Sequence, residues 1–156
     1  MKTIVYALAF CLFIQSCDNF PKDPEHTLEK VTNGTLIVGY SENPPWVVKT
    51  SQAPTGIEAE LVKEFANDLG ATVQWKNGNE QTLVESLEKQ EIHLLIAGLT
   101  KDTPWAKKAG ISRPYVEHQK KKHVMAVQLG ENAFLVHLEK FLHEKKPDIQ
   151  TRLPNE

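Results

Sequence analysis

The sequence predicts an α/β domain with a mostly parallel sheet and flanking helices. Residues 92–97 form a short apolar run that ends at Gly98, which is typical of a strand buried on both faces of a parallel sheet. Residues 57–69 carry an apolar stripe at helical spacing and end at Gly70, a residue suited to a helix C-terminus. Strand-like and helix-like segments alternate, an order that favours parallel strands joined by right-handed crossovers.

The other elements follow from the same patterns. Strands are expected where β-branched and apolar residues run together or alternate, at residues 35–40, 71–75, 92–97 and 124–128. Helices are expected at residues 27–31, 57–69, 81–90 and 131–145. The last helix should stop at Pro147, because proline removes a helical hydrogen bond.

Size and composition limit the function. The chain has 156 residues, enough for one domain with its own core, and a formal net charge of -2 that gives no reason to expect nucleic acid as a partner. The two cysteines, Cys11 and Cys17, both lie near the start, so the body of the chain has no disulfide framework. Without cysteines or closely spaced histidines in the body, we expect no metal site and no cofactor.

The N-terminus has the form of a targeting segment. Lys2 and the apolar residues after it predict a signal peptide at residues 1–16. The segment Ile14-Gln15-Ser16-Cys17 resembles a bacterial lipobox, which implies a lipid anchor on Cys17 that faces the periplasm. Asp18 resembles the retention signal of enterobacterial lipoproteins and favours the inner membrane. An ordinary signal peptide and an uncleaved anchor are the alternatives.

Domain boundaries follow from composition. Prolines and charged residues after Cys17 predict a tether at residues 17–27. The folded domain is expected at residues 28–145. Residues 146–156 have little apolar content and are expected to be a flexible tail.

A candidate ligand loop follows the third strand. Ligands of open α/β sheets bind outside the carboxyl ends of the strands, where Gly98, Leu99 and Thr100 lie. An ordinary exit from strand to loop is the alternative. Trp46 follows two prolines that stiffen its loop. Together with Trp105, it could stack on a ligand or on a partner protein. The alternative is that each tryptophan packs back onto its own loop.

Other charged groups have simpler explanations. Glu58 and Glu60 stand on the first turn of a helix, where acids favour the helix dipole. His118 and His123 flank three lysines, which predicts a solvated edge. Contact with anionic lipid headgroups is the alternative for that segment. We find no nucleophile elbow, phosphate loop or acid–base pair, so we expect no enzymatic activity.

Several motifs in order resemble the bacterial extracellular solute-binding proteins of family 3, the type that binds amino acids in the periplasm. They are Gly34-Thr-Leu-Ile-Val-Gly39, Pro44-Pro45-Trp46, Gly56-Ile-Glu-Ala-Glu-Leu61, and Ile96-Ala-Gly-Leu-Thr100 with Ser112-Arg-Pro-Tyr115. The resemblance implies the type II periplasmic-binding-protein fold, in which two lobes close on a ligand. Here only residues 116–127 separate Tyr115 from the return segment, so we expect the first lobe alone, with the crossover cut short at about residues 120–127.

The resemblance also shows where the ligand loop departs from its family. Thr100 matches a family position that contacts the ligand. Trp105 stands where the family usually has an arginine that grips the ligand's α-carboxylate. Asp102 replaces a usual threonine, and His93 replaces a usual aspartate.

We therefore expect a membrane-anchored, single-lobe solute-binding-like lipoprotein that weakly binds a small polar molecule, such as an amino acid or a related compound, and is linked to transport. Its expected ligand-binding residues are Asn43, Trp46, Gly98, Leu99, Thr100 and Trp105. The alternatives are a protein–protein interaction or self-association module that uses the face left by the missing lobe, and a relic without a binding role. Membrane-bound lytic transglycosylases carry a similar domain, but the chain ends before a catalytic domain could begin, so we expect no such activity.

Overall fold

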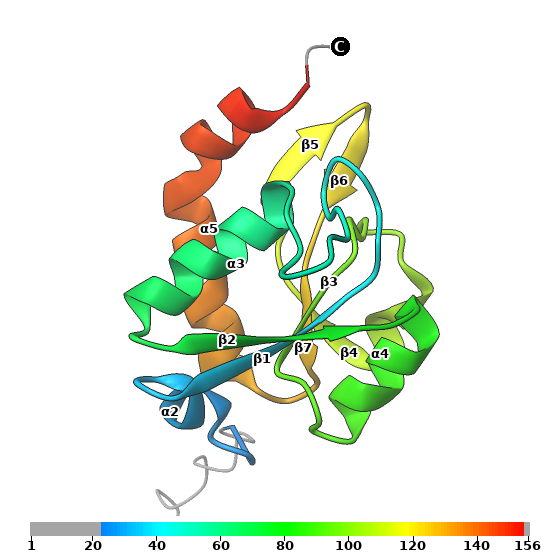
Figure 1. Ribbon diagram of the computed structural model, residues 1–156. Helices are drawn as coiled ribbons and strands as arrows, with labels where there is room; N and C mark the ends of the chain where they lie inside the picture. Colours follow the sequence, from blue (N-terminus) through cyan, green and yellow to red (C-terminus); the bar gives the residue numbers. More distant parts are fainter. Residues whose placement is uncertain (1–22, 155–156) are drawn as a thin grey trace, which may run out of the picture.

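The computed structural model describes residues 23–154 and arranges them in three layers, with helices on both faces of a five-stranded sheet (Figure 1). The strands of this sheet are β1 (Thr35–Tyr40), β2 (Thr72–Asn77), β3 (Leu94–Ile96), β4 (Ala109–Ile111) and β7 (Ala126–Gln128). A separate hairpin contains β5 (Val116–His118) and β6 (Lys121–His123). The helices are α2 (Thr27–Val31), α3 (Ile57–Asp68), α4 (Glu80–Glu88), the 3-10 helix η2 (Pro104–Lys107) and α5 (Asn132–Arg152).

The sheet confirms the predicted fold class. Its strand order is β2-β1-β3-β7-β4, and β1 pairs in parallel with both β2 and β3. β7 is antiparallel to β3 and to β4, so the sheet is mostly but not entirely parallel. β4 was missed in the sequence because it is three residues long and contains Gly110.

Alternating side chains of the central strands form two cores. On one face, Val38 and Leu94 pack with the apolar stripes of α3 and α5. On the other, Leu95 packs against Leu83 and Leu87 of α4. The predicted stripe of α3 is thus confirmed as a core face, and the two cores hold the carboxyl ends of β1 and β3 between the helical layers.

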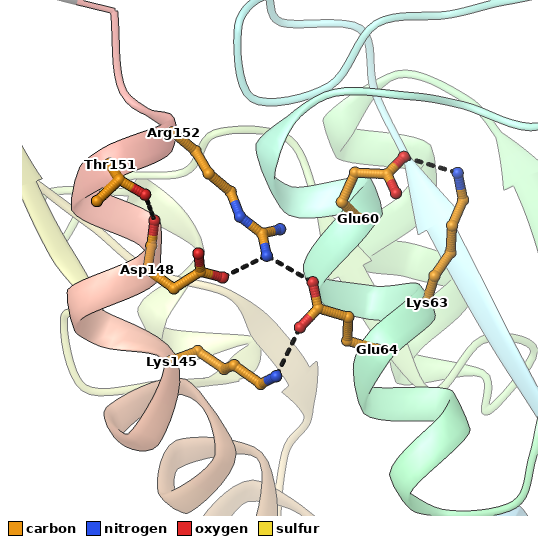
Figure 2. Close-up of polar contacts among 7 residues, drawn as sticks. All are labelled: Glu60, Lys63, Glu64, Lys145, Asp148, Thr151 and Arg152. Carbon is orange, nitrogen blue, oxygen red and sulfur yellow. Dashed lines mark hydrogen bonds and ion pairs between the residues drawn. The ribbon is translucent and has the colours of Figure 1, made fainter.

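Helix α5 does not stop at Pro147 but continues to Arg152. Ile149 is fully buried, and Glu64 of α3 accepts ion pairs from Lys145 at 2.7 Å and from Arg152 at 2.6 Å (Figure 2). Asp148 pairs with the same guanidinium. These contacts hold the last turns on α3, so the loss of one backbone hydrogen bond at Pro147 is tolerated. The predicted flexible tail is therefore wrong for residues 146–152.

The segment before α2 is also attached to the domain. Glu131 accepts hydrogen bonds from the backbone of Glu25 at 2.9 Å and of Thr27 at 2.8 Å. Asp23 accepts one from the backbone of Ala133 at 2.6 Å. Residues 23–27, predicted as tether, are therefore part of the lobe. The signal peptide, Cys17 and Asp18 lie outside the described residues, and within residues 23–154 no helix is long and apolar enough to cross a membrane.

The hairpin β5–β6 lies where the crossover was predicted to be cut short. Its turn consists of Gln119 and Lys120, with φ of 49° and 62°. Two consecutive left-handed residues make the tight turn that antiparallel strands favour. The chain thus returns at once into β7 and α5, and the described residues form one lobe.

Candidate functional site

The carboxyl ends of β1 and β3 meet at one edge of the sheet, as predicted. The backbone N–H of Ser41 donates to the carbonyl of Ile96 at 3.1 Å. The Asn43 side chain donates from Nδ2 to the carbonyl of Ala97 at 2.8 Å. Asn43 therefore ties the loop after β1 to the loop after β3, and this bond occupies one donor of its side-chain amide.

Gly98 is required by the geometry of the loop after β3. Its φ is +61°, in the left-handed region that favours glycine. A Cβ there would lie 2.6 Å from Nδ2 of Asn43 and 2.6 Å from Cδ1 of Trp46. No side chain fits, so the loop after β3 and the loop after β1 are in direct contact at Gly98.

Trp46 packs inward, which settles the alternative left open by the sequence. Its exposed fraction is 4%, and its ring stacks on His123 of β6 with centroids 3.7 Å apart. It also meets the ring of Tyr115 edge-on. Trp46 is thus a core residue that joins the loop after β1 to the hairpin, and its ring face is not open to a ligand.

Leu99 and Thr100 differ in their access to solvent. Leu99 is 4% exposed and packs in the core under α4, while its carbonyl accepts from the backbone of Val124. Thr100 is half-buried and lies opposite His123 in an isolated β-bridge. Of these two residues, only Thr100 presents its side chain toward solvent.

Trp105 lies on η2 and is half-buried. Its indole Nε1 donates to a carboxylate oxygen of Glu80, at the start of α4, at 3.0 Å. Asp102, three residues earlier in the same turn, is exposed. The edge of the site therefore carries an oriented indole ring and a solvated carboxylate where the family usually has an arginine and a threonine.

Glu58 is a site residue that the sequence reasoning missed. Its side chain is fully buried, and its carboxylate accepts from the backbone N–H of Gly98 at 2.8 Å and from the Tyr115 hydroxyl at 2.6 Å. The predicted explanation, that acids on the first turn of a helix favour its dipole, is insufficient for Glu58. It is accurate for Glu60, which is exposed and pairs with Lys63 (Figure 2).

Helical periodicity contains the signal that separates these two acids. Glu58 lies three, four and seven residues before Leu61, Val62 and Phe65, so it falls on the apolar stripe. Glu60 is followed at the same spacings by polar residues. An acid on an apolar stripe predicts a buried carboxylate with dedicated partners.

Burial governs the ionisation of Glu58. It raises the pKa of Glu58 from 4.5 to about 7, against the opposing effect of hydrogen bonds from Tyr115 and from the backbone of Gly98. Burial, together with the nearby carboxylate, raises the pKa of Tyr115 well above its usual value. The group that holds the ligand loop therefore titrates near neutral pH.

His123 and His118 are buried, with 4% and 9% exposed, so the prediction of a solvated edge is wrong for both. His123 hydrogen-bonds to the backbone of Gly98, yet burial lowers its pKa overall. The exposed lysines of the turn and of β6 lie between the two buried rings in sequence. Packing against Trp46, a contact between distant segments, explains the burial.

The groups at the strand ends divide into those that are bonded within the fold and those that can meet a molecule. The carboxylate of Glu58, the N–H of Gly98 and one donor of the Asn43 amide are used in bonds that shape the loop. Within residues 23–154, no three histidine, cysteine, aspartate or glutamate side chains are grouped to hold a metal ion. Thr100, Trp105, Asp102 and the exposed side chain of Asn43 remain as the groups at the edge of the site that can meet a solute.

Comparisons with known proteins agree with the fold. The family described as bacterial extracellular solute-binding proteins, family 3, matches residues 36–151. A solved structure, the arginine-bound form of domain 1 from TmArgBP, is 26% identical with a TM-score of 0.66, over 74% of this chain and 97% of that chain. An ancestral arginine-binding protein bound to arginine has a TM-score of 0.69 at 16% identity, over 79% of this chain and 100% of that chain, and supports the fold.

Curated relatives carry a different name. Membrane-bound lytic murein transglycosylase F of Vibrio cholerae is 33% identical over 101 residues, 62% of this chain and 19% of the relative. The protein of the same name from Pseudomonas putida is 32% identical over 116 residues, 72% of this chain and 23% of the relative. The chain therefore spans about a fifth of the length of the curated relatives that it matches.

Proposed function

The chain belongs to the bacterial extracellular solute-binding proteins of family 3, and on that premise we propose that it binds a small polar solute at the carboxyl ends of β1 and β3. The contacts would come from Thr100, Trp105 and Asp102, on a loop fixed by Gly98 and Asn43. One observation carries this proposal. Domain 1 of TmArgBP has been solved in an arginine-bound form, and the match to this chain covers 97% of that domain. A first lobe by itself can therefore hold a ligand.

The side chains at this edge favour a solute with a cationic group. The indole of Trp105 packs against the core beneath α4 and stays partly exposed, and aromatic rings of this kind attract ammonium and guanidinium groups. Asp102 adds an exposed carboxylate. No arginine stands where the family grips an α-carboxylate, and Lys101, an exposed point charge on a flexible stem, does not reproduce that planar fork.

Binding should be weak. A hydrogen bond to a charged group contributes about 1.5–3 kcal/mol, so the missing arginine alone should cost at least tenfold in affinity for an α-amino acid. A single lobe also leaves one side of the solute in water, whereas good small-molecule sites bury roughly 70–90% of their ligand. We therefore expect dissociation constants near the millimolar range.

Placement in the cell rests on the N-terminal sequence. We propose that Cys17 carries a lipid anchor and that the lobe faces the periplasm, with Asp18 favouring the inner membrane. The role is binding rather than catalysis, and a link to a transporter is part of the same proposal. The names of the curated relatives include an enzymatic activity, but the match covers only about a fifth of their length.

The alternative of a docking face now has less support. Trp46, one of its two aromatic anchors, is buried. In residues 23–154, the exposed large apolar side chains are Leu129, which follows β7, and Val136, which lies on α5. Neither residue lies at the strand ends. No observation places an apolar patch on the face that a second lobe would cover.

Calorimetry on the full chain can test the proposed solute chemistry. The probes are arginine, agmatine, which lacks the α-carboxylate, and citrulline, which is the uncharged analogue of arginine. We expect arginine and agmatine to bind within about threefold of each other, because nothing grips the α-carboxylate, and citrulline to bind at least fivefold more weakly. No measurable heat from agmatine would overturn the proposal.

Two variants locate the binding. Thr100→Ala should weaken agmatine binding about fivefold, the effect of one hydrogen bond. The control is Thr35→Ala, at the other end of β1, where the side chain is exposed and faces Thr72. Equal affinity in both variants would exclude Thr100 from the site.

A further inference from the structure

A cavity lies away from the strand ends, between helix α5 and the segment that links β4 to β5. Its volume is about 380 Å³. Arg113, Pro114 and Tyr115 form one wall, and a face of α5 forms the other. This volume is within the range of roughly 300–1,000 Å³ that small-molecule sites occupy.

The cavity carries an excess of positive charge in a chain whose net charge is negative. Arg113, Lys140 and Lys146 line it together with one carboxylate, Glu139. That carboxylate accepts from the backbone N–H of Arg113 at 2.7 Å and lies 3.3 Å from its Nε, so its charge is matched within the wall.

The two lysines are the cations that remain available. Lys140 and Lys146 are exposed, and among residues 23–154 no carboxylate is recorded in an ion pair with either of them. Asp148, close to Lys146 in sequence, pairs with Arg152 instead (Figure 2). His143, on the same helix face, adds a ring that can donate a hydrogen bond.

The cavity also has apolar lining residues. Val136 lines it and is 63% exposed, although its side chain would be more stable when covered. Leu142 and Tyr115, which are each 2% exposed, also line the cavity. Cations beside an uncovered apolar surface fit a ligand that has an anionic head and an apolar body.

We propose that this cavity binds a small organic carboxylate whose anionic group lies between Lys140 and Lys146 and whose apolar part covers Val136. Lysine recognises a carboxylate as a compact point charge with several donors. The site is separate from the strand ends, and it selects the opposite charge from the solute proposed there.

The test uses amide chemical shifts of the ¹⁵N-labelled full chain. The anionic probe is benzoate, and the matched probe is benzylamine, which has the same ring and the opposite charge. We expect benzoate to shift the amide signals of Tyr115, Val136 and His143 with saturation, and benzylamine to leave them unchanged. Equal shifts with both probes, or none with benzoate up to tens of millimolar, would overturn the proposal.

A pair of variants separates the site from general charge. Lys140→Gln with Lys146→Gln should weaken benzoate binding at least tenfold, since two charged contacts are lost. Lys49→Gln with Lys89→Gln removes the same net charge at exposed positions outside the cavity and should leave the affinity unchanged. The unshifted remainder of each spectrum reports that the variant is folded. Benzoate binding that survives the first pair contradicts the assignment.

Discussion

The strand ends and the α5 cavity use their polar groups in opposite ways. At the strand ends, the buried carboxylate of Glu58 bonds to the backbone N–H of Gly98 and to the Tyr115 hydroxyl, and it defines the shape of the loop. In the α5 cavity, Lys140 and Lys146 are exposed and bond to no carboxylate recorded among residues 23–154. A polar group that is buried and bonded stabilises the fold, while one that stays exposed keeps its capacity for a ligand.

This difference separates stability from binding. Changes to the buried groups of the strand ends should reduce the free energy of unfolding strongly, and they should affect binding through the loop. Changes to the cavity lysines should affect binding alone.

The largest effect is expected for Glu58→Ala. The change leaves the Gly98 N–H and the Tyr115 hydroxyl buried without their acceptor, at about 1–3 kcal/mol each, so the free energy of unfolding should fall by about 4 kcal/mol. Chemical denaturation measures it. Glu60→Ala, two residues away and exposed, should change it by less than about 0.5 kcal/mol. Similar losses in the two variants would contradict a special role for Glu58.

The pH dependence of stability should also depend on Glu58. Because the folded pKa of about 7 exceeds the ordinary 4.5, the native state binds the proton more tightly than the unfolded chain does. The stabilisation is full below about pH 4.5 and is lost as the pH rises through 7, a change of about 3 kcal/mol.

Glu58→Gln keeps an acceptor for Gly98 but does not titrate. The difference in unfolding free energy between wild type and this variant should therefore decline from pH 5 to pH 8. His93 and His123, whose pKa values are lowered chiefly by burial, act in the opposite direction, with stability lost as the pH falls below 6.5. Both histidines are present in wild type and variant, so their contributions to the difference in unfolding free energy largely cancel. A difference that stays constant with pH would show that Glu58 does not titrate in this range.

A smaller loss is expected for Gly98→Ala. The left-handed φ costs about 1 kcal/mol, and the contacts with Asn43 and Trp46 should bring the total to about 2 kcal/mol. Gly130→Ala is the control, because Gly130 has a φ of +95° but no atom within 3.8 Å of an added Cβ. Denaturation curves that place the two variants together would mean that the close approach at Gly98 is not required.

The smallest effect on stability is expected for Lys140→Gln with Lys146→Gln. Both side chains are exposed, so the free energy of unfolding should change by less than about 0.5 kcal/mol. The same denaturation measurement checks it. A loss above 1 kcal/mol would show that these lysines maintain the fold, and the contrast between the two regions would fail.

Local patterns predicted most of the fold. Both ends of β1 were predicted correctly, because a run of β-branched and apolar residues bounded by Gly34 and Ser41 favours a strand over other structures. The start of α3 at Ile57 and the first lobe also follow from sequence. The continuation of α5 beyond Pro147 could not be predicted, because it depends on Glu64, which is far away in the chain.

The candidate site was predicted less completely. Gly98 and Thr100 could be placed because strand ends are a general feature of α/β sheets. The burial of Trp46 depends on His123, more than seventy residues later, and no local pattern reports that contact. Glu58 was within reach of sequence reasoning, because it lies on the apolar stripe of its helix.

The most direct test of the central claim is an agmatine titration of the ¹⁵N-labelled full chain. Binding at the strand ends should shift the amide signals of Gly98 and Thr100 and the indole signal of Trp105, while those of Val136 and His143 in the α5 cavity stay in place. Shifts confined to the cavity, or no shifts at tens of millimolar agmatine, would contradict a solute site at the ends of β1 and β3.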